Sequence, residues 1–100
     1  MLVLVWEYRV RPERVDEFEA FYRPDGPWGE LFRNAPGFVS VTLMKDLSDA
    51  ERFLVADRWT SETLYEEFKR NHPSEYASLS AGGRRLYERE TEIGRFDFVD

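Results

Sequence analysis

The chain contains one histidine, His72, and this side chain is the best suited to moving a proton. Imidazole has an ordinary pKa near neutrality, so His72 is the first candidate for removing a proton from a bound molecule. Pro73 follows directly, and His72 could instead cap a helix end, where a cation meets free carbonyl groups. Tyr76 lies four residues after His72 and is a further candidate contact, with Pro73 leaving the geometry of the pair open.

Two aromatic residues and an arginine lie close together upstream of His72. Trp59 and Tyr65 could line a cleft, with the phenol of Tyr65 hydrogen-bonded to a bound aromatic molecule. They could equally fill a core, because large aromatic side chains dominate burial. Arg58 is a candidate for binding a carboxylate or phenolate, since a guanidinium holds planar anions in a fork. It could instead pair with Glu7, Asp57 or the acidic residues of a second subunit.

The composition excludes several kinds of site. The chain has no cysteine, so thiolate zinc sites, disulfides and cysteine nucleophiles are excluded, and a reducing, cytoplasmic location is expected. With one histidine, a transition-metal site would need carboxylates for nearly all its ligands, and we expect no metal. Gly82-Gly83 alone is not a dinucleotide motif, so we expect neither a flavin nor a nicotinamide cofactor.

The length of the chain predicts the number of domains, and its charge argues against certain partners. One hundred residues correspond to a single domain, residues 1–100. Twenty acidic residues against 14 basic ones give a net charge of −6, which argues against nucleic acid or an anionic membrane as partner. The apolar run that begins the chain is too short for a secretory or membrane-spanning segment and instead predicts a strand.

The hydrophobic pattern predicts a βαββαβ order. Apolar residues alternate as in strands over residues 2–10, 38–45, 52–60 and 90–99. Helical spacing covers residues 12–22, 28–32, 61–71 and 73–87, with breaks at the Pro24–Pro27 segment and Pro73, and Gly82-Gly83 predicts a kink or fraying. This order is typical of a ferredoxin-like α+β fold, with a four-stranded antiparallel sheet and helices on one face.

The first three strands carry large apolar side chains on both faces, so the face without helices needs a cover. The simplest cover is a second copy of the sheet, which predicts a homodimer joined through its sheet faces. The alternative is a monomer whose outer face is made polar by Glu7, Arg9, Ser40, Thr42, Arg58 and Arg95.

Three segments carry a resemblance to a known family. They are FLVADRWTSETLYEEF at residues 53–68, the Ala35-Pro36-Gly37-Phe38 entry into a strand, and VRPERVDEFEAFY at residues 10–22. In order and spacing they resemble the antibiotic biosynthesis monooxygenase domain family. The resemblance implies a dimeric α+β barrel, which agrees with the two-sided apolar strands.

The resemblance also suggests which residues to examine. Quinone-forming members of the family would have an Asn on the third strand, then a Trp and a Tyr; Trp59 and Tyr65 match, whereas Val55 replaces the Asn. Their later Arg falls at Leu79, with Arg84 and Arg85 nearby but not aligned. Haem-degrading members would have an Asn in the first strand, a Trp in the second helix and a His on the following helix. These positions fall near Glu7, Phe68 and Ser78, so none of the three residues is present and haem degradation ranks low.

Our first hypothesis is a cofactor-independent monooxygenase that oxidises a phenolic or quinol-like compound. In it His72 is the base, Tyr65 the hydrogen-bonding group and Trp59 the pocket wall, with Tyr76 and Arg58 as further substrate contacts. The alternatives are a non-catalytic homodimeric module that binds a small apolar metabolite, and a purely structural dimer. A concave pocket with His72 pointing inward would favour the enzyme.

Overall fold

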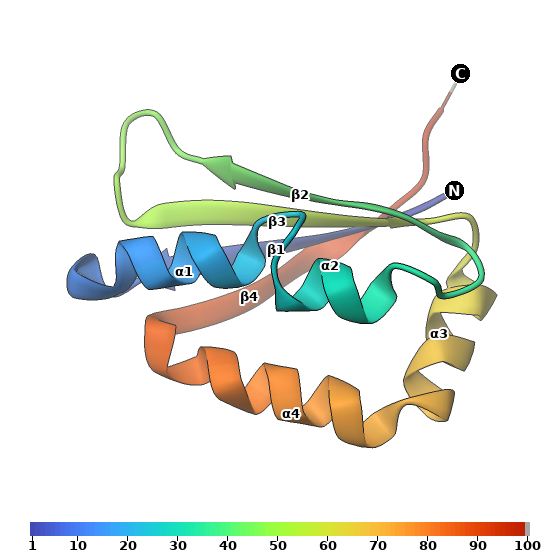
Figure 1. The fold of residues 1–100 in the computed structure, drawn as a ribbon. Helices are drawn as coiled ribbons and strands as arrows, with labels where there is room; N and C mark the ends of the chain where they lie inside the picture. The colour runs from blue at the N-terminus through green and yellow to red at the C-terminus, as the bar shows by residue number, and fades with distance from the viewer. Residues whose placement is uncertain (100) are drawn as a thin grey trace.

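The computed structural model describes residues 1–99, which form one antiparallel sheet with all helices on one of its faces (Figure 1). Neighbouring strands follow the order β2-β3-β1-β4, which confirms the predicted ferredoxin-like arrangement. The strands are β1 (Leu2–Val10), β2 (Phe38–Lys45), β3 (Arg52–Trp59) and β4 (Tyr87–Phe96). The helices are α1 (Val15–Tyr22), α2 (Pro27–Phe32), α3 (Glu62–Asn71) and α4 (Pro73–Gly83), with single turns η1 (Pro12–Arg14) and η2 (Arg84–Leu86).

The central strands β1 and β3 supply most of the sheet's contribution to the core. Alternation along β1 turns Leu2, Leu4, Tyr8 and Val10 toward the helices, where all four are buried. On β3 the same alternation buries Phe53, Val55 and Trp59. Asp57 belongs to this row of β3 and therefore points toward the helices as well.

A bulge in β2 changes the faces predicted for that strand. Phe38 pairs with Trp59 and Ser40 pairs with Arg58, so Val39 is the extra residue. As a result Phe38 lies on the helix side with Val41, stacking edge-on to Trp59, whereas Val39 is exposed. The prediction that Val39 shares a face with Val41, opposite Phe38, was therefore wrong, because strict alternation does not hold across a bulge.

The helical segments begin where the sequence predicts. The side chain of Ser61 accepts a hydrogen bond from the backbone N–H of Leu64 (3.2 Å) and so caps α3. Helix α4 begins at Pro73 and continues through Gly82 to Gly83. Tyr87, which was predicted to continue this helix, instead begins β4 and pairs with Val10. The last strand thus starts three residues earlier than expected and ends at Phe96.

The edge strand β4 turns charged side chains toward the helices. Arg95 pairs with Leu4 of β1 and lies on the helix side of the sheet, where its guanidinium bonds Glu62 (2.7 Å) and Glu66 (2.9 Å) of α3. The monomer alternative placed Arg95 on the outer face, and this placement was wrong, because the bulges in the β1–β4 pairing were not visible in the sequence.

The outer face of the sheet is partly apolar and carries no helix (Figure 1). Half-buried Val3, Val5, Leu54 and Ala56 lie on it, and Met44 and Phe96 are exposed at its sides. Charged pairs occupy one end, where Arg52 bonds Glu7 (2.6 Å). Within residues 1–99 no helix is long and apolar enough to cross a membrane.

Candidate functional site

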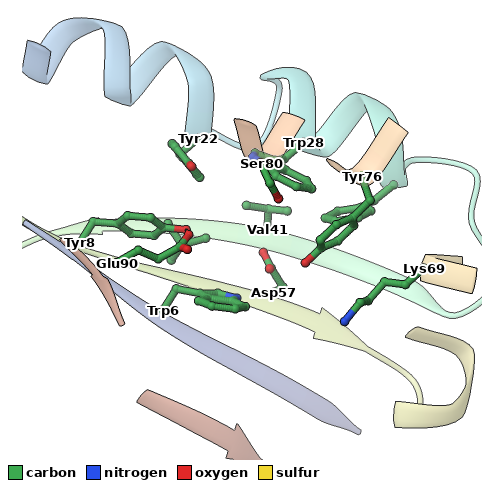
Figure 2. Close-up of a pocket in the computed structure, with 12 residues that line it drawn as sticks. Trp6, Tyr8, Tyr22, Trp28, Val41, Asp57, Lys69, Tyr76, Ser80 and Glu90 are labelled. Carbon is green, nitrogen blue, oxygen red and sulfur yellow. The ribbon is translucent and has the colours of Figure 1, made fainter. Parts of the chain in front are cut away.

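A cavity of about 250 Å³ lies between the sheet and helices α1, α2, α3 and α4 (Figure 2). Every strand and all four helices contribute side chains to its wall. Six of the lining residues are aromatic: Trp6, Tyr8, Tyr22, Trp28, Phe32 and Tyr76. The others are Val41, Val55, Asp57, Lys69, Ser80 and Glu90. The volume is below the about 300–1,000 Å³ of ordinary small-molecule sites, so it fits a ligand of one or two rings.

Asp57 is the carboxyl group that faces the middle of this cavity (Figure 2). It lies on the helix side of β3, between Leu4 of β1 and Val41 of β2, and the other inward-facing residues of β3 are apolar. Burial raises the pKa of Asp57 to about 7, against a smaller lowering effect of the indole N–H of Trp6. A carboxylate with this pKa can accept a proton near neutral pH, which is the property of a general base.

Two tyrosines form a hydrogen-bonded pair beside Asp57. The hydroxyl groups of Tyr65 and Tyr76 lie 3.1 Å apart, and Tyr76 lines the cavity while Tyr65 is buried behind it. Burial raises the pKa of both phenols, so both remain protonated at neutral pH and can donate hydrogen bonds. The ammonium group of Lys69 lies over the two rings, 5.0 Å from the centroid of Tyr65 and 5.5 Å from that of Tyr76.

Glu90 marks the opposite end of the cavity (Figure 2). Its carboxylate accepts a hydrogen bond of 2.6 Å from the buried hydroxyl of Tyr8. Tyr8 in turn packs against Tyr22, with ring centroids 5.0 Å apart. Burial raises the pKa of Tyr8, with the charge of Glu90 acting in the same direction, so this phenol stays a donor.

Trp59 supports the wall from behind and does not line the cavity. Its side chain is fully buried and packs edge-on against Phe32, 5.3 Å between ring centroids, and against Tyr65, 5.4 Å. Val55 lines the cavity directly. The structure thus brings Tyr65 and Tyr76 together beside the cavity, with Trp59 packed against Tyr65.

His72 and Arg58 lie away from this group. The imidazole of His72 is 43% exposed, stacks on Phe68 at 4.6 Å and contacts a carboxylate oxygen of Glu75 through Nδ1 (2.9 Å). Neither His72 nor Arg58 lines the cavity. Arg58 points to the outer face of the sheet, where its guanidinium lies 5.1 Å from the ring of Phe98, because neighbouring strand residues point to opposite faces.

Sequence reasoning assigned no chemistry to Asp57, Lys69 or Glu90. For Asp57 a signal existed, because it is an acidic residue in a row of inward-facing apolar residues on a central strand. For Glu90 and Lys69 the sequence held no such signal, since both resemble residues of a solvated face. Residues 1–99 contain no group of three His, Asp or Glu side chains that could hold a metal ion.

Comparison with known structures supports the fold assignment. A candidate antibiotic biosynthesis monooxygenase from Nitrosomonas europaea superimposes with a TM-score of 0.76 at 14% identity, covering 100% of both chains. A similar candidate from Deinococcus radiodurans gives 0.79 at 11% identity, covering 100% of this chain and 94% of the other. SnoaB, a cofactor-independent oxygenase from Streptomyces nogalater in a mutant form, gives 0.77 at 18% identity, covering 99% and 93%. At these identities the likeness concerns the fold alone.

Sequence comparison identifies the family. No curated protein matches the chain. The family model for antibiotic biosynthesis monooxygenases matches residues 1–75, which include three of the four strands and most of the cavity wall. The chain therefore belongs to the antibiotic biosynthesis monooxygenase family.

Proposed function

We propose that this protein is a cofactor-independent monooxygenase that oxidises a phenolic or quinol-like compound of one or two rings, with Asp57 as the base. Membership of the monooxygenase family supports the reaction class. The observation that carries the proposal is the Asp57 carboxyl group, which faces the middle of an aromatic cavity and has a pKa of about 7. His72, the base expected from the sequence, lies outside the cavity, and we assign the proton transfer to Asp57 instead.

In this proposal the phenol hydroxyl of the substrate donates to the Asp57 carboxylate and loses its proton to it. The resulting phenolate is electron-rich enough to pass an electron to dioxygen without a cofactor. The phenoxyl radical and superoxide then combine to form a carbon–oxygen bond on the ring, and protonated Asp57 returns its proton to the resulting peroxide. The O–O bond breaks as the same ring carbon loses its hydrogen, which releases water and leaves the quinone, so that substrate and O2 give quinone and water. The hydroxyl of Tyr76 and the ammonium of Lys69 stabilise the developing charge, and Tyr65 positions Tyr76.

Oxygen uptake by the metal-stripped protein tests the reaction. We expect saturable uptake above the autoxidation blank with hydroquinones and naphthols, and quinone formation in proportion to the oxygen consumed. A flat response across the panel would contradict the proposal.

Val55 favours a second candidate, a non-catalytic module that binds a small apolar metabolite. An apolar side chain here removes the polar group that the family's quinone-forming members would use at this position. Binding of the same phenols without oxygen uptake would support this candidate.

We also propose that the protein is a homodimer joined through the outer faces of its sheets. The exposed Met44 and Phe96 and the half-buried row around Leu54 and Ala56 support this, because a lone sheet rarely leaves such a surface to water.

The Leu54→Glu variant is expected to convert the dimer to a monomer, because it replaces an apolar side chain of this surface with a carboxylate directly across from Glu7. Light scattering during size-exclusion chromatography measures the mass. Leu47→Glu is the matched control, since Leu47 is fully exposed in a loop and should leave the mass unchanged. A monomeric parent protein would contradict the proposal.

A further inference from the structure

The cavity has more acidic than basic groups on its wall. Asp57 and Glu90 line it, and Lys69 is the one basic residue among the lining side chains. Lys69 already lies 3.9 Å from a carboxylate oxygen of Glu66, which is not part of the wall. Within residues 1–99 no ion pair joins Asp57 or Glu90 to a basic side chain. The wall therefore carries two carboxyl groups, of which Glu90 is exposed to solvent, and one ammonium group that is shared with Glu66.

The aromatic walls are themselves suited to a cation. An ammonium group over the face of a Tyr or Trp ring is attracted by the negative charge of that face. Lys69 makes this contact at one end of the cavity, where its ammonium lies over Tyr65 and Tyr76. At the other end of the cavity, Tyr8 and Tyr22 lie on the side of Glu90, and the indole of Trp6 lies between Glu90 and Asp57 (Figure 2). Among the residues that the structure describes, no lysine lines this end of the cavity.

The carboxyl groups of Asp57 and Glu90 come from strands on opposite sides of β1 and from different positions along β1. Asp57 of β3 is paired with Leu4, whereas Glu90 of β4 is paired with Tyr8. Four residues of strand separate these positions, about 13 Å along the backbone. In Figure 2 Asp57 lies near Tyr76, and Glu90 lies with Tyr8 at the other end. A ligand that reaches both carboxyl groups must therefore carry a hydrogen-bond donor at each of its two ends.

We propose that the substrate is a phenol with a protonated amine on a short side chain, its hydroxyl at Asp57 and its ammonium at Glu90. The hydroxyl contact rests on the proposed function, whereas the ammonium contact needs no catalysis. Glu90 holds the ammonium while one of its oxygens accepts the hydrogen bond from Tyr8, and the aromatic rings around it stabilise the positive charge.

Three ligands of nearly equal size and different charge test this inference. They are tyramine, which is a cation, 4-propylphenol, which is neutral, and 3-(4-hydroxyphenyl)propionate, which is an anion. Binding is measured by calorimetry without oxygen at pH 7.5. We expect tyramine to bind about five-fold more tightly than 4-propylphenol, and the anion to bind least tightly.

The Glu90→Gln variant should bring the affinity for tyramine down to that for 4-propylphenol, because the amide retains an acceptor for Tyr8 but loses the charge. Glu92→Gln is the matched control: it changes the net charge equally, on the same strand, but Glu92 pairs with Arg95 and does not line the cavity. This control should keep the preference. Thermal melting of both variants checks that they fold.

The other outcomes test the ammonium site and the proposed oxygenase activity separately. If the parent protein binds 4-propylphenol as tightly as tyramine, if Glu90→Gln keeps the preference, or if none of the three ligands binds, the inference is wrong. If tyramine is preferred but no phenol supports oxygen uptake, the ammonium site is upheld and the proposed oxygenase activity fails. If 4-propylphenol is oxidised and tyramine is excluded, the activity is upheld and the inference fails.

Discussion

The Asp57→Asn variant is expected to consume oxygen at least about 100-fold more slowly than the parent protein with any phenol that the parent oxidises. The amide has almost the same size and can still form hydrogen bonds with the substrate, but it cannot accept the phenol proton. The loss should therefore appear in kcat, with a much smaller change in KM. Initial rates of oxygen uptake at pH 8, with quinone formation followed by absorbance, measure both parameters.

Two further variants make this result specific. Asp25→Asn removes an exposed carboxylate outside the cavity and should leave the rate unchanged. His72→Ala separates the two candidate bases, and the Asp57 assignment requires that this variant retain the parental rate within about two-fold. Loss of uptake in His72→Ala together with full uptake in Asp57→Asn would transfer the role to the imidazole and show that our assignment is wrong.

The Asp57→Asn substitution is also expected to stabilise the protein at alkaline pH. Because the folded-state pKa of Asp57 is about 7 and its ordinary value is 3.8, the folded protein binds this proton more tightly than the unfolded chain does. The free energy of unfolding of the parent protein should therefore decrease through this group as the pH rises from about 4 to about 7. Asp57→Asn lacks this loss and should be more stable at pH 8 by on the order of 4 kcal/mol, or roughly 20 °C in Tm.

Thermal melts of both proteins at pH 4 and pH 8 measure this effect. The comparison isolates Asp57, because the carboxylates whose pKa is lowered by arginine or backbone contacts, such as Glu17 and Asp46, are the same in both proteins. The difference in Tm should be large at pH 8 and small at pH 4. An equal Tm at pH 8 would mean that ionising Asp57 does not destabilise the folded protein, so that its pKa is not raised by folding. A gain in stability with a loss of activity is the trade-off expected of a buried catalytic group.

Most of the fold could be predicted because its strands alternate and its helices begin at clear signals. The row of inward-facing residues on β1 and the cap at Ser61 are examples. The errors fall where local rules stop applying. The bulge at Val39 interrupts the alternation of β2, and Tyr87 fits the spacing of a helix although its pairing with Val10 makes it a strand residue.

The candidate site was predictable only in part, for a related reason. Tyr65 and Tyr76 were expected near a bound molecule, and the structure brings their hydroxyl groups together. Asp57 was considered only as a partner of Arg58, but neighbouring strand residues point to opposite faces, so the two cannot meet within one sheet. Glu90 reaches the cavity through the register between β1 and β4, which depends on bulges that the sequence does not reveal.

A titration of the Asp57 side-chain carboxyl by ¹³C NMR tests most directly whether this group is the base of the cavity. The signal is assigned by its absence from the spectrum of Asp57→Asn. We predict a midpoint near pH 7 in the free protein and a change in the signal when a phenol binds without oxygen. A midpoint near pH 4, or a signal that does not respond to any phenol that binds, would contradict the account.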